Sequence, residues 1–276
     1  GQSKTTYTLK ISRLIPVLAL LCLLSAYTSR AQSDSSGYFT SFDSVKIHYE
    51  VKGRGKPVLL IHGFTGSGSD WKYKPLTDSL LAHGFMVIMP DLRGNGLSDQ
   101  PTVPEAYANN AEAKDLIGLL RFLGIREYDA VGYSRGSIIL ASLLVRDKGC
   151  KRAVIGGMGA DFTNPEWPRR IGFYHALMND TIPGYEGFRK YIAQKGLNPL
   201  VLACQQKEQP STSAEELARL TLPVLIICGD QDTDNGKGSD LQLLIPNATF
   251  VEVPGNHNTS AWTPEFAGKV LSFLMQ

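Results

Sequence analysis

Ser134 lies between two glycines, Gly132 and Gly136, in the sequence GYSRG. A short apolar run precedes it at residues 128–133, and a second apolar run follows the glycine. This order predicts a strand, a sharp turn and a helix, with Ser134 in a strained backbone conformation and glycines where side chains would crowd each other. Such a turn exposes the hydroxyl as a nucleophile. It also places the backbone N–H of Arg135 at a helix N-terminus, where it can stabilise an oxyanion.

The segments that must position Ser134 alternate between short apolar runs and longer amphipathic stretches. With 43% hydrophobic residues the chain can bury a substantial core. We therefore expect an α/β fold with a mostly parallel central sheet of about eight strands and helices on both faces. The expected strands are 37–42, 45–51, 58–63, 85–90, 128–133, 153–157, 223–228 and 248–253, and the expected helices include 75–83, 105–124, 136–147 and 261–275. Ligands bind beyond the carboxyl ends of such strands, where Ser134 falls.

Residues 160–215 interrupt this alternation, because they separate two strands by far more than an ordinary connection. We interpret the segment as a small helical cap over the C-terminal edge of the sheet. Its aromatic residues are Phe162, Trp167, Phe173, Tyr174, Tyr185, Phe188 and Tyr191. They pack the core of the insertion itself or form an apolar acyl site. The basic residues Arg169, Arg170, Arg189 and Lys190 are an anion contact or a solvated face.

Four separate motifs in order make the chain resemble the α/β-hydrolase family over roughly residues 45–275. They are HGFTGS (62–67), PDLRGNGLSD (90–99), GYSRG (132–136), and the pair CGDQD (228–232) with PGNHNTS (254–260). The chain is similar to esterase-like members that use a serine nucleophile. The serine argues against haloalkane and epoxide chemistry, for which the family resemblance implies an aspartate nucleophile.

The resemblance also implies a base and an acid for Ser134, since a serine hydroxyl is a weak nucleophile until a base takes its proton. The histidines are His48, His62, His83, His175 and His257. Only His257 follows the last expected strand on a glycine-bearing loop, where the family keeps its base. The family usually places its acid three residues after a glycine, which from Gly229 is Asp232. Asp161, after the preceding strand, remains the alternative.

By the same resemblance the second oxyanion donor is the backbone N–H of Phe64, beside that of Arg135. We expect a serine hydrolase, most simply a carboxylesterase that cleaves a small or medium ester through an acyl-enzyme intermediate, with no metal or organic cofactor. A calcium loop is not expected near residue 232, because Asn235 and Leu241 replace the glycine and glutamate that it requires. Amide or peptide hydrolysis, carbon–carbon bond hydrolysis, and a ligand-binding receptor with little turnover remain alternatives.

Residues 1–31 are predicted to be an export signal ahead of a hydrolase domain at 32–276. A basic start, an uncharged apolar run at 14–26 and the small residues Ser29 and Ala31 form the pattern. The run is shorter than the roughly 18 residues of a membrane span, so we expect cleavage and a periplasmic or secreted protein, with a retained anchor as the alternative. The basic residues lost with the signal are Lys4, Lys10, Arg13 and Arg30. The remaining 24 basic and 26 acidic residues give no electrostatic reason to bind nucleic acid, and no membrane contact is expected once the signal is removed.

Overall fold

The structure, a computed structural model, describes residues 1–3, 34–178 and 181–276. Most of the predicted export signal, residues 4–31, lies outside these ranges. The helices and strands described below belong to the unit formed by Ser33–Gln276. Across the described ranges, no helix combines the length and the apolar character needed to cross a bilayer.

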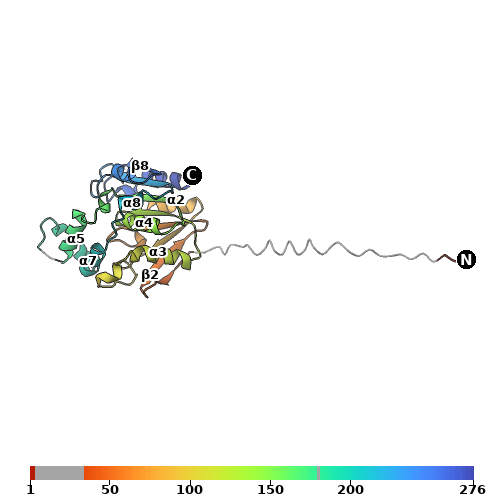
Figure 1. Cartoon of the computed structure of the whole chain (residues 1–276), viewed down its shortest axis with the longest axis horizontal. Coiled ribbons are helices and arrows are strands. Elements are labelled where there is room, and N and C mark those ends of the chain that lie inside the picture. Colours follow the sequence, from red (N-terminus) through yellow and green to blue (C-terminus); the bar gives the residue numbers. More distant parts are fainter. Residues whose placement is uncertain (4–33, 179–180) are drawn as a thin grey trace. The chain divides into compact units, whose positions relative to one another are not determined.

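Within the described residues, eight strands form one sheet in the order β1-β2-β4-β3-β5-β6-β7-β8 (Figure 1). The strands are β1 Ser35–Thr40, β2 Lys46–Lys52, β3 Lys56–Ile61, β4 Phe85–Pro90, β5 Tyr128–Tyr133, β6 Cys150–Gly156, β7 Val224–Gly229 and β8 Ala248–Val253. The pairs β1–β2 and β2–β4 are antiparallel, and every other neighbouring pair is parallel. The predicted mostly parallel α/β sheet is confirmed.

The helices lie in the connections between these strands, except for the last one, which follows β8. They are α2 Pro75–Ala82, α3 Ala111–Phe122, α4 Arg135–Arg146, α5 Pro168–Met178, α6 Glu186–Gln194, α7 Pro199–Lys207, α8 Ala214–Leu217, α9 Gly238–Gln242 and α10 Pro264–Leu274. The helix expected at 105–124 is divided. A short 3-10 helix, Pro104–Tyr107, precedes it, and Asn109 and Asn110 adopt left-handed φ values of 56° and 58°. Since a right-handed helix cannot continue through such residues, α3 begins only at Ala111.

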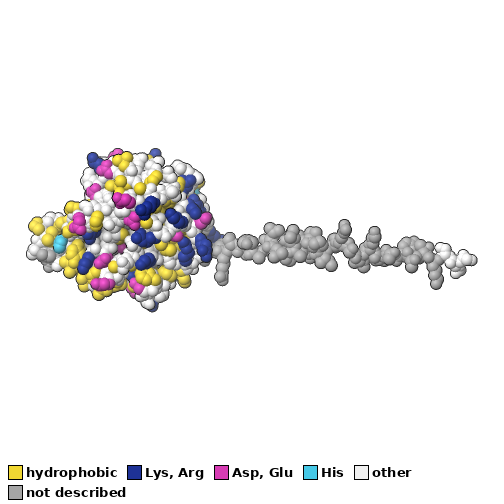
Figure 2. All heavy atoms as spheres, in the orientation of Figure 1, with side chains coloured by type: hydrophobic (Ala, Val, Ile, Leu, Met, Phe, Trp, Pro, Cys, Tyr) yellow, Lys and Arg dark blue, Asp and Glu magenta, His cyan; other side chains and the backbone are white. Residues whose placement is uncertain are grey.

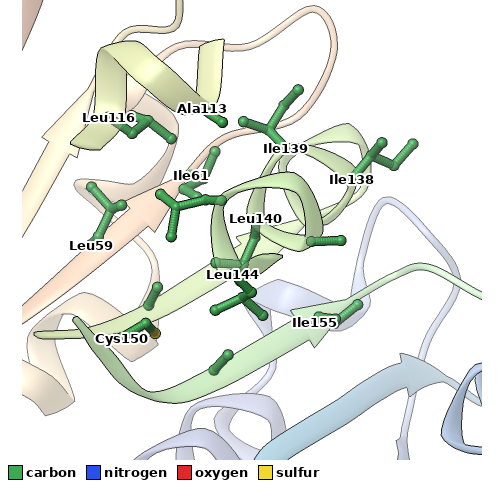
Figure 3. Packing of buried hydrophobic residues seen from close by; sticks show 14 of the residues in the cluster. Leu59, Ile61, Ala113, Leu116, Ile138, Ile139, Leu140, Leu144, Cys150 and Ile155 are labelled. Carbon is green, nitrogen blue, oxygen red and sulfur yellow. The ribbon is translucent and has the colours of Figure 1, made fainter. Parts of the chain in front are cut away.

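The core lies on both faces of the sheet. Alternate side chains of β3 point to opposite faces, so Leu59 and Ile61 belong to one hydrophobic cluster and Val58 and Leu60 to the other. The first cluster includes residues of α3 and α4, which Figure 3 shows packed over the strands. The second includes residues of α2 and α10. Burial on both faces explains why the central strands are continuous apolar runs.

The insertion between β6 and β7 contains α5, α6, α7 and α8. Figure 1 shows α5 and α7 together to one side of the sheet. Buried Leu177, Ile192 and Leu202 form a small separate cluster, against which Phe64 from the loop after β3 also packs. Figure 2 shows hydrophobic side chains gathered over the region of α5 and α7, where Met178 and Leu200 are exposed. The contact of Phe64 with this cluster shows that the insertion packs against the loop that follows β3.

Candidate active site

Ser134 occupies the turn between the last residue of β5 and the first residue of α4. Its φ of 55° and ψ of −127° form a conformation that costs a residue with a side chain about 1–3 kcal/mol. The backbone is held there, because its N–H donates to the carbonyl of Gly156 on β6 at 2.9 Å and its own carbonyl accepts from Ser137 at 2.9 Å. The half-buried hydroxyl is thus displayed at the carboxyl end of the sheet by a turn that its neighbours hold under strain.

The glycines on either side of Ser134 make room for backbone atoms. A Cβ on Gly132 would lie 2.6 Å from the carbonyl oxygen of Gly136. A Cβ on Gly136 would lie 2.2 Å from the carbonyl oxygen of Ile61, at the end of β3. Both separations are far below van der Waals contact, so neither position accepts a side chain without movement. The expected crowding across the turn applies to Gly132, whereas Gly136 is limited by a different strand.

The structure brings the hydroxyl of Ser134, the imidazole of His257 and the carboxylate of Asp232 together. Nε2 of His257 lies 2.9 Å from Oγ of Ser134, and Nδ1 lies 2.8 Å from Oδ2 of Asp232. The His257 side chain is 14% exposed and that of Asp232 is 3% exposed. With its proton on Nδ1 donated to the carboxylate, the ring presents Nε2 as an acceptor to the serine hydroxyl. This geometry suits transfer of the serine proton to His257.

Asp232 and not Asp161 faces the imidazole of His257. Asp161 begins a 3-10 helix, Asp161–Thr163, and makes no hydrogen bond or ion pair with His257 in the described part of the chain. Burial acts to raise the pKa of Asp232, but the hydrogen bond and charge of His257 outweigh it, and Arg169 adds to their effect. The pKa of Asp232 is therefore below its ordinary value. The carboxylate is an anion at neutral pH and can stabilise a protonated imidazole.

Tyr133 holds the loop that carries His257. Its hydroxyl donates to the His257 carbonyl at 2.6 Å and lies 2.8 Å from Oγ of Ser260. Its ring stacks on the imidazole of His257, with the two ring centroids 5.4 Å apart. Asn256, immediately before His257, accepts the Thr259 N–H through its side-chain oxygen at 3.1 Å and so closes a local turn. Sequence reasoning missed Tyr133. Its place next to Ser134 was visible in GYSRG, but the contact of its hydroxyl was not.

The loop after β3 passes close to Ser134. A Cβ on Gly63 would lie 3.5 Å from the Cβ of Ser134. The side chain of Asn95, in the segment after β4, donates to the carbonyl of Phe64 at 2.9 Å and so stabilises the loop. Neither the Phe64 N–H nor the Arg135 N–H donates to a protein acceptor in the described residues. Both are available to a ligand, and Asn95 is a supporting residue that sequence reasoning did not single out.

His62 stabilises this loop through contacts of its ring nitrogens with backbone groups. Its Nδ1 lies 2.8 Å from the carbonyl of Gly63, and its Nε2 accepts the N–H of Leu92 at 3.0 Å. Burial lowers the pKa of His62 and keeps the ring neutral, which matches the acceptor role of Nε2. The structure places its ring nitrogens on backbone groups and not on Ser134.

The side chain of Arg135 is buried and turned away from solvent. Its guanidinium makes two hydrogen bonds to the carboxylate of Glu112 on α3, at 2.7 and 2.9 Å, and a third to the side chain of Gln209 after α7 at 3.0 Å. A paired Arg–carboxylate of this kind leaves little net charge. Arg135 thus links the turn at Ser134 to α3 and to the segment after α7, and the sequence did not indicate this link.

A cavity of about 610 Å³ adjoins Ser134 and His257. Its walls combine residues of the sheet loops with residues of the insertion. Its aromatic lining residues are Phe64, Trp71, Tyr133, Trp167, Phe173, Phe188, Tyr191 and Trp262. Phe173 and Phe188 of the insertion pack on Phe64, with ring centroids 5.8 and 6.1 Å away. Phe173 and Phe188 also pack on each other, with ring centroids 4.7 Å apart, so the packing role expected for the insertion's aromatic residues is confirmed for these two, and the acyl-site role stays a prediction.

His257 and two nearby carboxylates have the chemistry of metal ligands. One ligand atom each from Asp232, Asp234 and His257 lie within 4.8 Å of one another. The atoms of Asp232 and His257 are already joined by a hydrogen bond, and the carboxylate of Asp234 lies 3.8 Å from Arg169. A cation there would compete with the hydrogen bond of His257 and with the positive charge of Arg169, so the arrangement fits proton transfer better than metal binding.

Known proteins resemble this chain in sequence and in fold. The family model for the alpha/beta hydrolase fold matches residues 56–190. The chain is 26% identical over 254 residues to a putative non-heme chloroperoxidase of Synechocystis sp., covering 80% of this chain and 91% of that protein. It is 38% identical over 97 residues to epoxide hydrolase 3 of Siraitia grosvenorii, which is 35% of this chain but only 30% of that relative's length.

A solved structure extends the likeness over most of the chain. A thermophilic esterase from Thermogutta terrifontis is 25% identical and superimposes with a TM-score of 0.70. The match covers 87% of this chain and 98% of that one. The likeness in fold therefore extends over most of both chains.

Proposed function

Because the chain belongs to the α/β-hydrolase fold family, we propose that it is a serine hydrolase, and specifically a carboxylesterase acting on a small or medium ester. One observation carries the proposal. Two hydrogen bonds in series join Asp232 to His257 and His257 to Ser134, whose hydroxyl sits on a strained turn beside a cavity. Nucleophile, base and orienting acid are the groups that acyl transfer requires.

In the proposed first half-reaction, Oγ of Ser134 attacks the acyl carbon while Nε2 of His257 takes its proton. The backbone N–H groups of Phe64 and Arg135 donate to the oxygen that becomes negative in the tetrahedral intermediate. Asp232 stabilises the imidazolium that forms. His257 then gives the proton to the departing alcohol, and the acyl group remains on Ser134 as an ester.

In the second half-reaction a water takes the place of the alcohol. His257 removes a proton from the water, the hydroxide attacks the acyl-serine, and the same N–H groups stabilise the second intermediate. The proton returns to Oγ of Ser134 as the acid product leaves. The enzyme ends each cycle with Ser134 and His257 in their starting forms.

The serine favours acyl substrates over the epoxides that a relative's name specifies. An epoxide opened by Ser134 would leave an ether bond between the serine and the substrate. A water activated by His257 does not cleave an ether. An acylated serine is an ester and can be hydrolysed. Turnover therefore requires a carbonyl substrate, and the aromatic wall that includes Phe173 and Phe188 suits an apolar acyl group.

The test compares Ser134→Ala with wild type on p-nitrophenyl acetate and butyrate. We expect a loss of about three orders of magnitude or more in kcat. The matched control is Ser36→Ala, on exposed β1 at the edge of the sheet, which should retain wild-type turnover. A fluorophosphonate should label wild type and Ser36→Ala but not Ser134→Ala.

Amide and β-diketone substrates in the same assay separate ester hydrolysis from peptide and carbon–carbon bond hydrolysis. Equal rates for Ser134→Ala and wild type would reject the nucleophile. Ligand binding without turnover of any substrate would instead identify a receptor.

A further inference from the structure

A lysine is buried in the wall of the cavity that contains Ser134. Lys74, immediately before α2, is 8% exposed. Its Nζ donates to the carbonyl of Asp70 at 2.7 Å and lies over the rings of Trp262 and Trp71, 4.5 and 5.2 Å from their centroids. Burial lowers the pKa of Lys74, and the nearby charge of Asp70 opposes that shift. The carbonyl and the two rings compensate only part of the cost of removing an ammonium group from water.

No acidic side chain in the described ranges forms an ion pair with Lys74. The carboxylate of Asp70 instead accepts the backbone N–H of Ser67 at 3.1 Å. Lys72, two residues earlier, shows the contrast, since its Nζ lies 3.2 Å from the carboxylate of Glu50. An ammonium has three N–H donors, and Lys74 uses one of them on the protein. A buried cation with spare donors in a cavity wall is the expected signature of a ligand site.

The other basic groups in the cavity wall are better compensated or more exposed. Arg135 is paired with Glu112, and Arg169 lies 3.8 Å from Asp234. Arg170 donates to the carbonyl of Gln206 in the last turn of α7 and to that of Pro165 before α5, and Lys195 is exposed. Lys74 is therefore the buried cation of this wall that has no acidic partner among the described residues.

We propose that Lys74 is an anion-binding residue of this cavity and that the natural substrate is an ester carrying a carboxylate. The inference rests on the proposed hydrolase function and names its substrate class. A carboxylate would accept the two spare N–H donors of Lys74 as charge-assisted hydrogen bonds. Lys74 is only 8% exposed, and the attraction between opposite charges is stronger where water is largely absent.

The expected kinetic effect follows from the chemistry. The charge of a carboxylate remote from the acyl carbon does not change during the reaction. Lys74 would therefore bind the substrate and the transition state equally, so its loss should raise KM for an anionic ester and leave kcat nearly unaltered. Hydrogen bonds to a charged group contribute about 1.5–3 kcal/mol, which corresponds to a preference of about tenfold or more.

The experiment uses two matched ester pairs, each differing only by a carboxylate against a neutral primary amide. One pair places the group on the acid side, as p-nitrophenyl hydrogen glutarate and its amide. The other places it on the alcohol side, as carboxymethyl butyrate and carbamoylmethyl butyrate. We expect wild type to prefer the carboxylate in at least one pair by about tenfold in kcat/KM. In Lys74→Met the ratio should fall to about one, through KM, and Lys74→Arg should restore part of it.

Lys72→Met is the matched control, because it removes a neighbouring lysine that lies outside the cavity lining, and it should keep the wild-type ratio. A wild-type ratio near one in both pairs, or a ratio in Lys74→Met equal to that in Lys72→Met, would overturn the proposal. If Lys74→Met does not fold, Lys74→Gln replaces it.

Binding to Ser134→Ala, measured by calorimetry without turnover, separates this inference from the proposed function. Preferred binding of the carboxylate, abolished by adding Lys74→Gln, supports the anion site even if wild type hydrolyses neither ester. Equal binding of the carboxylate and the amide contradicts it.

Discussion

Replacing Asp232 with Asn tests the proposed proton-transfer chain most directly. The substitution keeps the size of the side chain but removes the negative charge that lies 2.8 Å from Nδ1 of His257. If the new amide donates to Nδ1, the ring proton moves to Nε2, which then cannot accept the proton of Ser134, 2.9 Å away. In either amide orientation, the imidazolium that forms during catalysis loses its counter-charge.

The size of the effect follows from the distance. Two unit charges about 4 Å apart, the approximate separation of the centres of the carboxylate and the imidazolium, interact by about 4 kcal/mol at an effective dielectric constant of ~20. Each 1.36 kcal/mol, about one pKa unit, changes a rate tenfold. We therefore expect Asp232→Asn to lower kcat on p-nitrophenyl acetate by about a thousandfold with little change in KM, because the counter-charge acts mainly in the transition state.

Asp161→Asn is the matched control, since Asp161 was the alternative acid and does not contact His257. It should retain kcat within about twofold, as expected for a side chain outside the proton-transfer chain. Thermal unfolding of both variants shows whether each remains folded at the assay temperature. A loss of less than tenfold in Asp232→Asn, or an equal loss in Asp161→Asn, would refute the assignment of the acid.

Three further predictions concern positioning, packing and pH. Tyr133→Phe removes the hydroxyl that holds the His257 loop, and kcat/KM on p-nitrophenyl acetate should fall about tenfold, as for the loss of one or two hydrogen bonds. Gly136→Ala places a Cβ 2.2 Å from the carbonyl of Ile61, and urea unfolding should show a stability loss of about 1–3 kcal/mol. Because folding lowers the pKa of Asp232, its ionisation contributes stability that is complete above the ordinary pKa of aspartate and is lost as the pH falls through the lower folded value. The stability difference between wild type and Asp232→Asn, measured by urea unfolding, should therefore change over that acid range, and a pH-independent difference would contradict the shift.

Local sequence predicted much of the sheet. The expected bounds of 85–90, 128–133 and 248–253 agree with the structure to the residue, because turn-forming residues flank each apolar run. β6 begins at Cys150, earlier than expected, since Lys151 and Arg152 hide the start of a strand that pairs with β5 there. The periodicity at 105–124 likewise hid the break at Asn109, because apolar spacing does not report a change in backbone handedness.

The candidate site also has features that were predictable from the sequence and features that were not. The turn around Ser134 was predictable because strand, glycine and helix preferences act over a few residues. The contacts of Tyr133, Asn95 and Arg135 were not, because their partners lie on segments far away in sequence. A local sequence pattern predicts the position of a side chain along a helix or strand but not the residues that it contacts in the folded protein.

The order of strands and helices along the chain, the strained turn at Ser134 and the set of candidate partners were predictable from local backbone preference and hydrophobic burial. The contact of His257 with Asp232 and not with Asp161 became visible only in the folded protein, as did the position of Lys74 over the rings of Trp71 and Trp262. The choice of partner depends on how the ends of β7 and β8 meet across the sheet. That geometry arises from long-range packing, which no short stretch of the chain encodes.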